Sequence, residues 1–374
     1  MKFETDLLIL RPQDVDLKYS PLRRSIDAGT YVLGAFNPGL ARLPNGNLLI
    51  MVRVAEALRN PIAGTKIHAI RWDKDGTYKL DGYSLEDVNA ADPRKFHLLR
   101  EHNETMALTS LSWLLPVELN ASGTEIVQFH YDKIIAPQKT YQEYGIEDAR
   151  ITQIEGTYYM TTCSVSAERH STTLYTSADG LNYSLQGIVL DHQNKDMLFF
   201  EGKIGGKFYA LTRPLGSLYF AYAPESPYHA GPSINLAESP DGLHWKPVDE
   251  PCIRPRKGST STMRIGGSAQ PILTPQGWLV LYHGVEVSGK VGIYRTFWAV
   301  LDAEDPTKIL HLDDENPVLE ANPDWTESLK MQMYLSDVVF TTGILDAGDQ
   351  YIVSSGELDL ACRITHIPKN YFTY

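Results

Sequence analysis

The densest group of residues suited to acid–base chemistry is the segment 144–152, with the sequence Y-G-I-E-D-A-R-I-T. It places Glu147, Asp148 and Arg150 in front of a run that predicts a strand. Adjacent side chains of a strand point to opposite faces, so only one of the two carboxylates is expected to face a given site. The alternative interpretation of this segment is a surface ion pair with Arg150.

Two further segments collect polar residues in front of apolar runs. Residues 191–203 mix acids and lysines and are followed, one predicted hairpin later, by Thr212-Arg213-Pro214. This mixture suits a polyhydroxylated or anionic ligand, although a solvated loop would look similar. Residues 264–271 contain two adjacent glycines, which let a backbone approach a ligand closely or serve a turn.

Motifs for other kinds of chemistry are absent. The sequence has no G-x-x-x-x-G-K-[ST], H-E-x-x-H or G-x-S-x-G motif, and no flanked G-x-G-x-x-G. Carboxylates remain, beside 10% aromatic residues that can stack on sugar rings. Glycoside cleavage needs an acid that protonates the leaving oxygen and a partner that delivers a nucleophile. The residues therefore favour a glycoside-cleaving enzyme.

The elements that must position these residues are predicted to be short strands in a repeated arrangement. A glycine turn followed by an apolar or aromatic run recurs along the chain, at Gly46, Gly156, Gly206, Gly277 and Gly348. An Asp-Gly turn typical of hairpins follows three of them, at 75–76, 179–180 and 241–242. Five such units predict an all-β chain folded as a five-bladed β-propeller. The alternative is an irregular pair of β-sandwiches.

Length and charge limit the remaining possibilities. The 374 residues are interpreted as one propeller domain, 1–374, with a long insertion around 87–103 that could instead be a linker between domains. The net charge of −12 argues against a nucleic-acid partner. Three distant cysteines predict neither disulfides nor a zinc site, and no metal is expected. No signal peptide or membrane span is seen, so a cytoplasmic protein is expected.

At these residues the sequence resembles glycoside hydrolase family 130, the β-mannoside phosphorylases and β-mannosidases. The resemblance runs nearly end to end. Its motifs are Ala35-Phe36-Asn37-Pro38 with 51–54, the segment 144–152 with Ala149 where the family has Pro, Asn194-Lys195-Asp196 with 202–204, 241–245, 282–285, and 337–340 with Gly343. The family implies a five-bladed propeller with a central site and a β-mannoside or manno-oligosaccharide substrate.

The resemblance also implies roles for individual residues. Asp148 takes the place of the family's proton donor. The residues expected to bind substrate are Asn37, Arg53, Glu147, Arg150, Lys195, Asp196, Arg213, His283 and Asp337. If the enzyme is a phosphorylase, inorganic phosphate is its co-substrate, and the residues expected to bind it are Arg150, Arg169, Lys195 and Lys203. No other cofactor is expected, and the chain could form a homo-oligomer.

The sequence departs from the phosphorylases at Thr212, where those enzymes typically carry His. Because a charge-assisted contact to phosphate is worth about 1.5 to 3 kcal/mol, its loss weakens phosphorolysis. We therefore expect an inverting enzyme that hydrolyses β-mannosides, with Glu201 as the base and Glu225 or Glu286 as alternatives. The competing hypotheses are a phosphorylase that releases mannose 1-phosphate, a non-catalytic glycan-binding propeller, and a propeller glycosidase acting on furanosides or fructosides.

Overall fold

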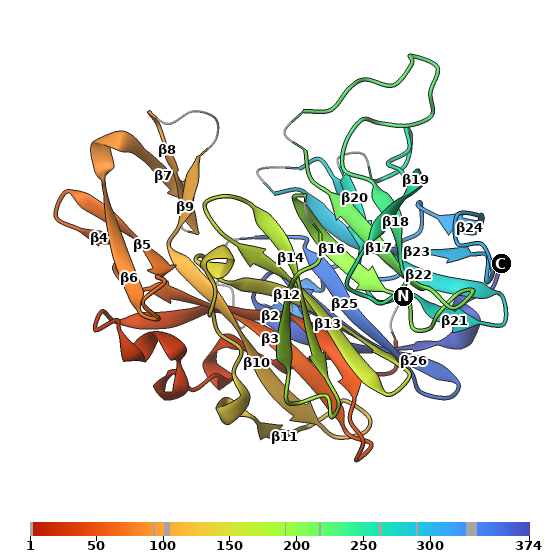
Figure 1. The fold of residues 1–374 in the computed structure, drawn as a ribbon, viewed down its shortest axis with the longest axis horizontal. Helices are drawn as coiled ribbons and strands as arrows, with labels where there is room; N and C mark the ends of the chain where they lie inside the picture. The colour runs from red at the N-terminus through yellow and green to blue at the C-terminus, as the bar shows by residue number, and fades with distance from the viewer. Residues whose placement is uncertain are drawn as a thin grey trace.

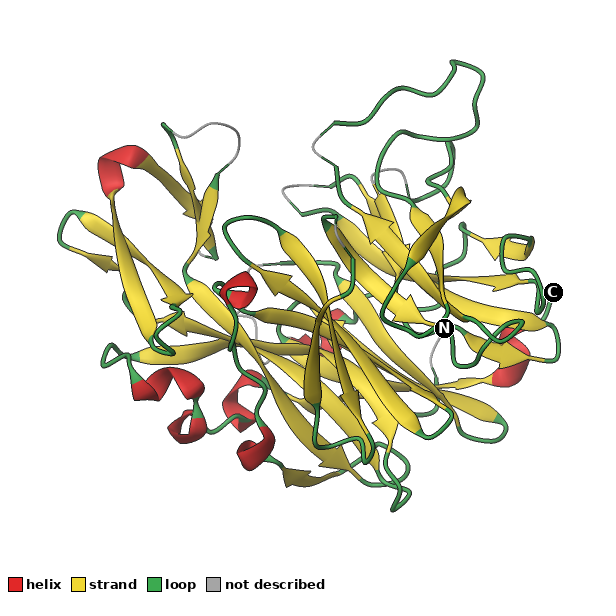
Figure 2. Cartoon of the chain, in the orientation of Figure 1, coloured by secondary structure: helices red, strands yellow, loops and turns green. Residues whose placement is uncertain are grey.

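The computed structural model describes residues 3–92, 94–100, 105–190, 192–216, 218–261, 264–288, 291–326 and 335–374, with the backbone alone at 249–252. Strands dominate these residues, and the helices are short turns (Figure 2). The prediction of an all-β chain is confirmed. The short helices are η1 (Pro12–Asp14), η2 (Leu17–Tyr19), η3 (Pro21–Arg24), η4 (Leu85–Asp87), η5 (Tyr131–Lys133), η6 (Thr140–Gln142), α1 (Pro323–Thr326) and η8 (Lys369–Phe372).

Five larger antiparallel sheets follow one another along the described chain. The first contains β2 (Thr30–Arg42), β3 (Leu48–Leu58), β10 (Ser110–Leu119) and β11 (Ile126–Phe129). The second contains β12 (Ile146–Ile154), β13 (Thr157–Val165), β14 (His170–Ser177) and β15 (Ser184–Ile188). The third contains β16 (Asn194–Phe199), β17 (Phe208–Pro214), β18 (Ile234–Ser239) and β19 (Lys246–Ile253).

The fourth sheet contains β20 (Arg264–Gly267), β21 (Ile272–Thr274), β22 (Gly277–Glu286), β23 (Ile293–Leu301) and β24 (Ile309–Asp313). The fifth contains β25 (Val339–Asp346), β26 (Gln350–Glu357), β27 (Ala361–Pro368) and β1 (Asp6–Leu10), in the order β1-β27-β26-β25. The first strand of the chain is therefore the outer strand of the last sheet. This pairing ties the two ends of the chain together.

The glycine turns lie where the repeats predicted them. Each connects the first long hairpin of one larger sheet: β2 to β3, β12 to β13, β16 to β17, β21 to β22 and β25 to β26. The turns at Asp179-Gly180 and Asp241-Gly242 connect β14 to β15 and β18 to β19. In both, a serine Oγ two residues before the aspartate accepts from the glycine N–H at 2.9 Å. The repeat thus encodes hairpins through local turn chemistry.

Two smaller sheets fill the long first interval between glycine turns. They contain β4 (Ile62–Ala63), β5 (Lys66–Trp72) and β6 (Tyr78–Ser84), and β7 (Val88–Asp92), β8 (Lys95–Leu98) and β9 (Met106–Leu108). Both project from one side of the molecule (Figure 1). The expected insertion around 87–103 falls largely on β7 and β8, while residues 93 and 101–104 lie outside the described residues.

Five hydrophobic clusters lie between neighbouring larger sheets. One packs the first sheet against the second, and others pack the second against the third, the third against the fourth, and the fourth against the fifth. The largest packs the fifth sheet against the first. The first strands of the sheets also contact one another, since β2 meets β12 and β25, β12 meets β16, and β16 meets β20. Their ends therefore meet at a common place.

Candidate active site

Four of these first strands carry an Asn or Asp in the left-handed backbone region at or just before the strand. They are Asn37 (φ 48°), Asp148 (φ 53°), Asp196 (φ 55°) and Asp337 (φ 56°). Asn and Asp tolerate this conformation better than other residues with a side chain. The strand register shifts at or beside the first three. Such bulges re-aim side chains, and here they turn polar groups toward the meeting point of the sheets.

The bulge at Asp148 overturns one expectation from the sequence. Regular alternation would send Glu147 and Asp148 to opposite faces, yet both carboxylates bind the same guanidinium. Arg53 Nη2 lies 2.7 Å from Glu147 Oε1, and Arg53 Nη1 lies 3.0 Å from Asp148 Oδ1. The left-handed backbone of Asp148 breaks the alternation, so both acids face one site. The interpretation of Arg150 as a surface ion pair is also wrong, because this residue is only 2% exposed.

A cavity of about 150 Å³ lies at this meeting point. Its lining residues are Asn37, Arg53, Asp148, Lys195, Asp196, Arg213, His283, Val291, Tyr294, Val338, Phe340 and Asp359. Seven of them were expected at the site from the sequence. Two more expected residues, Glu147 and Arg150, are buried and bind lining residues directly. The structure thus brings together nine residues from four of the larger sheets.

Asp148 is held by neutral and cationic donors. Asn37 Nδ2 donates to Asp148 Oδ1 at 2.9 Å, alongside Arg53. Burial alone would raise the pKa of the Asp148 carboxyl, but the charges of Arg53, Arg150 and Lys195 outweigh it and hold this pKa below its usual range. In this arrangement Asp148 is ionised at neutral pH.

Asp196 anchors a second group of cations. Arg213 Nη2 lies 2.7 Å from Asp196 Oδ2, and Arg150 Nη2 lies 3.4 Å from Asp196 Oδ1. Arg150 is fixed further by donating to the carbonyl oxygens of Ser268 at 2.7 Å and Asp148 at 2.8 Å. Burial, together with the nearby arginines, holds the pKa of His283 well below its usual value, so this ring is neutral. The arginines are therefore positioned before any ligand binds.

The cavity carries more positive than negative groups. Among the described residues, five cations lie in or against its wall, namely Arg53, Arg150, Lys195, Arg213 and Arg264. Four carboxylates oppose them, namely Glu147, Asp148, Asp196 and Asp359. Lys195 Nζ lies 3.1 Å from Glu147 Oε2. Arginine offers paired donors to phosphate oxygens, so this wall can hold an anion inside an acidic protein.

Two glycines make room for these side chains. A Cβ on Gly266 would lie 2.5 Å from His283 Cε1 and 2.8 Å from Asp196 Oδ2. A Cβ on Gly356 would lie 2.0 Å from Asn37 Oδ1. The sequence suggested that Gly266 lets a ligand approach the backbone. In the structure it lets two site residues approach instead.

Asp359 is a site residue that was not expected from the sequence. It lies in the hairpin between β26 and β27 with a left-handed backbone (φ 51°) and lines the same cavity. Burial raises the pKa of its carboxyl to about 6, against the opposing charge of Arg53. No motif marks Asp359, and the signal available was an acid between two apolar runs of the sequence. Tyr294 also lies outside the motifs, whereas Phe340 belongs to the motif 337–340, of which only Asp337 was expected at the site.

The remaining predicted residues lie elsewhere. Asp337 is exposed beside the cavity, and its carbonyl oxygen accepts from the Tyr294 N–H at 2.9 Å. Arg169 lines a separate groove between the second and third sheets. Glu225 is exposed in the connection between β17 and β18. The third candidate base, Glu286, is bound by Arg295 at 2.6 Å.

Glu201 and Lys203 lie beyond the opposite end of β16 from Lys195 and Asp196. A strand of this length spans about 17 to 20 Å. Lys203 pairs there with Glu155 at 2.6 Å, just past the far end of β12. The structure therefore does not bring Glu201 or Lys203 together with Asp148.

This placement predicts that Glu201→Gln leaves turnover of a β-mannoside nearly unchanged, within about twofold, because its carboxylate cannot reach the reacting carbon. The measurement is kcat and KM for sugar release with and without phosphate. A loss of about a hundredfold would contradict the placement of the site.

The described residues contain no group of three or more His, Cys, Asp or Glu side chains arranged to hold a metal ion. Within the same residues no helix has the length and apolarity needed to cross a membrane.

The chain is similar to proteins of known activity along most of its length. A beta-1,2-mannobiose phosphorylase of Listeria innocua serovar 6a is 33% identical over 348 residues, which cover 90% of this chain and 89% of that protein. The solved structure of the enzyme from Listeria innocua in complex with beta-1,2-mannobiose has a TM-score of 0.81 and 31% identity, covering 97% of this chain and 95% of that one. A beta-1,2-mannobiose phosphorylase of Thermoanaerobacter sp. (strain X514) is 27% identical over 333 residues, which cover 85% of this chain and 98% of that protein.

The names of these relatives contradict the expectation that the enzyme hydrolyses β-mannosides, and that expectation is wrong. All three are named phosphorylases, and none is named a hydrolase. The structure shows why Thr212 does not weaken phosphate binding. Thr212 lines the groove on the other side of β17, whereas Arg213 lines the cavity, so position 212 does not face Asp148. A catalytic base is needed only to activate water. Phosphorolysis therefore does not require Glu201, Glu225 or Glu286 to act as a base.

The family model described as beta-1,4-mannooligosaccharide phosphorylase matches residues 110–371, which is well over half of the chain. The matched residues include Asp148 and most of the cavity wall. The chain belongs to glycoside hydrolase family 130.

Proposed function

We propose that the protein is an inverting β-mannoside phosphorylase that acts on β-1,2-linked mannosides. The linkage is taken from the beta-1,2-mannobiose phosphorylases that the chain matches at 33% and 27% identity. The observation that carries the proposal is that five cations, two of them buried, lie in or against the cavity wall beside Asp148, against four carboxylates. In a protein of net charge −12, these cations can donate charge-assisted hydrogen bonds to a phosphate dianion.

The residues divide into two roles in this proposal. Asp148 supplies a proton to the leaving oxygen, either directly or through a hydroxyl of the mannose, while the C1–O bond breaks. A phosphate oxygen forms the new bond to C1 from the opposite face. Arg150, Lys195, Arg213 and Arg264 are proposed to hold the phosphate, and Asn37, Arg53, Asp337, His283 and Asp359 to surround the sugar. The products are α-mannose 1-phosphate and the released sugar.

The five larger sheets are proposed to form the five blades of a propeller. The hydrophobic clusters support this arrangement, because they join each sheet to the next and the fifth to the first. The pairing of β1 with β27 would then close the ring. A single domain, a homo-oligomer and a cytoplasmic location stay predictions of the sequence.

The test is to incubate the purified enzyme with β-1,2-mannobiose with and without inorganic phosphate and to identify the products. We expect phosphate-dependent release of α-mannose 1-phosphate and mannose in equal amounts, because the cavity is built for an anionic nucleophile. Free mannose alone, formed at the same rate without phosphate, would refute the proposal. β-1,4-Mannobiose is the matched substrate for the linkage, and we expect slower turnover of it.

A further inference from the structure

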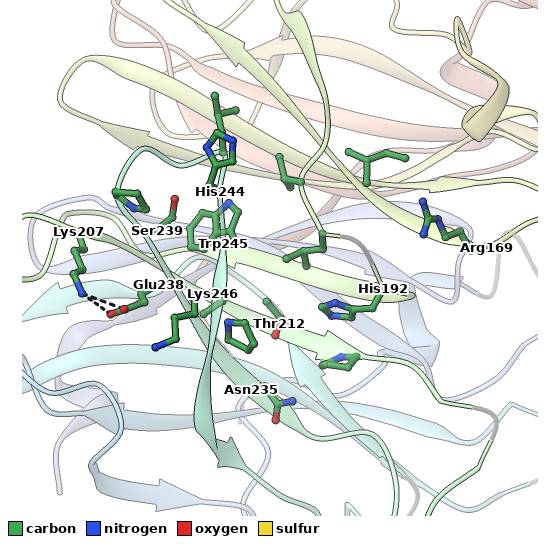
Figure 3. A pocket seen from close by; sticks show the side chains of 18 residues that line it. Arg169, His192, Lys207, Thr212, Asn235, Glu238, Ser239, His244, Trp245 and Lys246 are labelled. Carbon is green, nitrogen blue, oxygen red and sulfur yellow. Dashed lines mark hydrogen bonds and ion pairs between the residues drawn. The ribbon is translucent and has the colours of Figure 1, made fainter.

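A second and larger concavity lies between the second and third sheets. We call it the inter-sheet groove, and its volume is about 1000 Å³. Figure 3 shows Lys207, Glu238 and Trp245 toward one side of it and Arg169 and His192 toward the other. Pockets that hold drug-sized ligands measure about 300 to 1,000 Å³, so this groove has room for several sugar units.

Part of the groove lining consists of small side chains, which leave space between the two sheets. Asn235, Ala237 and Ser239 share one face of β18, since alternate residues of a strand point the same way. Thr212 adds a fourth small side chain from β17, and all four line the groove. Neighbouring sheets elsewhere in the chain close such space with large apolar residues, as the clusters between them show.

The lining suits a neutral polyhydroxylated ligand. Half-buried Trp245 lines the groove, and its indole N–H already donates to the Gly242 carbonyl at 3.0 Å, so what remains for a ligand is ring surface. Within the described part of the chain, Asn235 Oδ1 is buried without a hydrogen-bond partner. An aromatic surface beside an unsatisfied amide oxygen matches the apolar face and the hydroxyls of a sugar.

The charged residues of the groove lining are Arg169, Lys207, Glu238 and Lys246, and their side chains can hydrogen-bond to sugar hydroxyls. Lys207 Nζ donates to both carboxylate oxygens of Glu238 at 3.0 Å, and His244 Nδ1 lies 2.7 Å from Asp241 Oδ2. Lys207 and Glu238 therefore offset each other's charge. The end of the groove at Thr212 and Pro214 is separated from the cavity only by the strand that carries Arg213, which faces the cavity.

We infer that the inter-sheet groove is a second carbohydrate site, which binds a neutral manno-oligosaccharide while another stretch of sugar occupies the cavity. The inference rests on the proposed function for the identity of the sugar. It predicts two binding sites for a long β-1,2-manno-oligosaccharide and a preference for long substrates over the disaccharide.

The test uses Asn235→Trp, which places a bulky ring on the groove floor, and Gln186→Trp as the matched control. Gln186 lies on the neighbouring strand β15, is exposed, and is not part of the lining. Binding is measured by calorimetry in the Asp148→Asn background, so that the sugar is not consumed. We expect two binding sites in the Asp148→Asn protein and in the protein that carries Gln186→Trp as well. We expect one binding site in the protein that carries Asp148→Asn together with Asn235→Trp.

A kinetic readout accompanies the binding experiment. The ratio of KM for the disaccharide to KM for a hexasaccharide should fall about fivefold or more in Asn235→Trp and stay unchanged in Gln186→Trp. Trp245→Ala should act in the same direction. One binding site in the Asp148→Asn protein, or two in the protein that also carries Asn235→Trp, would overturn the inference. Lack of mannose 1-phosphate from every mannoside would overturn the proposed function alone, because binding is measured without turnover.

Discussion

Replacing Asp148 by Asn is expected to lower kcat for phosphorolysis of β-1,2-mannobiose by about 10² to 10⁴-fold, the usual contribution of a general acid. Asparagine has nearly the same shape and keeps an oxygen that can accept from Arg53, which donates to Asp148 Oδ1 at 3.0 Å. The variant therefore removes the proton and leaves the cavity in place. The measurement is release of mannose 1-phosphate at saturating phosphate, with Glu201→Gln as the matched carboxylate control.

The choice of leaving group separates a lost proton from a damaged site. A mannoside whose leaving group is a nitrophenolate needs little protonation, so Asp148→Asn should retain most of the wild-type rate on it. Equal losses on both substrates would assign Asp148 to binding. Retention of more than about a tenth of the disaccharide activity would remove it from the proton-donor role.

The low pKa of Asp148 fits this role only when phosphate binds. In the ligand-free cavity the charges of Arg53, Arg150 and Lys195 favour the carboxylate, which cannot donate a proton. A phosphate dianion bound to Arg150 and Lys195 would offset their charge and raise the pKa of Asp148. Binding of the nucleophile would then prepare the acid. Water brings no charge and would leave Asp148 ionised.

The sequence predicted the hairpins well because their cause is local. A glycine turn, or a serine with Asp-Gly two residues later, contains within a few residues the groups that form the turn. It also found most of the cavity, since Asn37, Asp148 and Asp196 each lie in a motif at a first strand. What it could not supply was the break in alternation at Asp148, which depends on a left-handed backbone held by neighbouring sheets.

Other errors arose because closeness in sequence does not equal closeness in space. Glu201 follows the polar cluster at Lys195 by one strand, and that strand carries it to the other end of the sheet. Thr212 adjoins Arg213 but points to the other side of β17. Asp359, by contrast, reaches the cavity from the last sheet, far from any motif. Which of these residues line the cavity is decided only by how the sheets pack together.

One buried arginine joins the two ends of the chain. Arg363 on β27 donates from Nε and Nη2 to the two carboxylate oxygens of Asp6 on β1, at 2.9 and 2.8 Å. Its Nη1 donates to Glu357 at 3.1 Å and to the Glu320 carbonyl oxygen at 2.8 Å. Arg363 is 4% exposed and Glu357 is fully buried, and burial raises the pKa of Glu357 to about 7. Asp6 is the acid in this network that comes from the start of the chain.

Asp6→Ala is expected to lower the free energy of unfolding by about 3 kcal/mol, because it removes the carboxylate that pairs with two nitrogens of a buried guanidinium and weakens the attachment of β1 to the last sheet. Lys308→Ala is the matched control, since Lys308 and Asp305 form an exposed pair at 3.1 Å, and such pairs contribute about 0 to 1 kcal/mol. Chemical denaturation of both variants measures the difference. A loss below about 1 kcal/mol for Asp6→Ala would mean that strand pairing and apolar packing hold β1 on the last sheet, and that the ion pair adds no more than a surface contact.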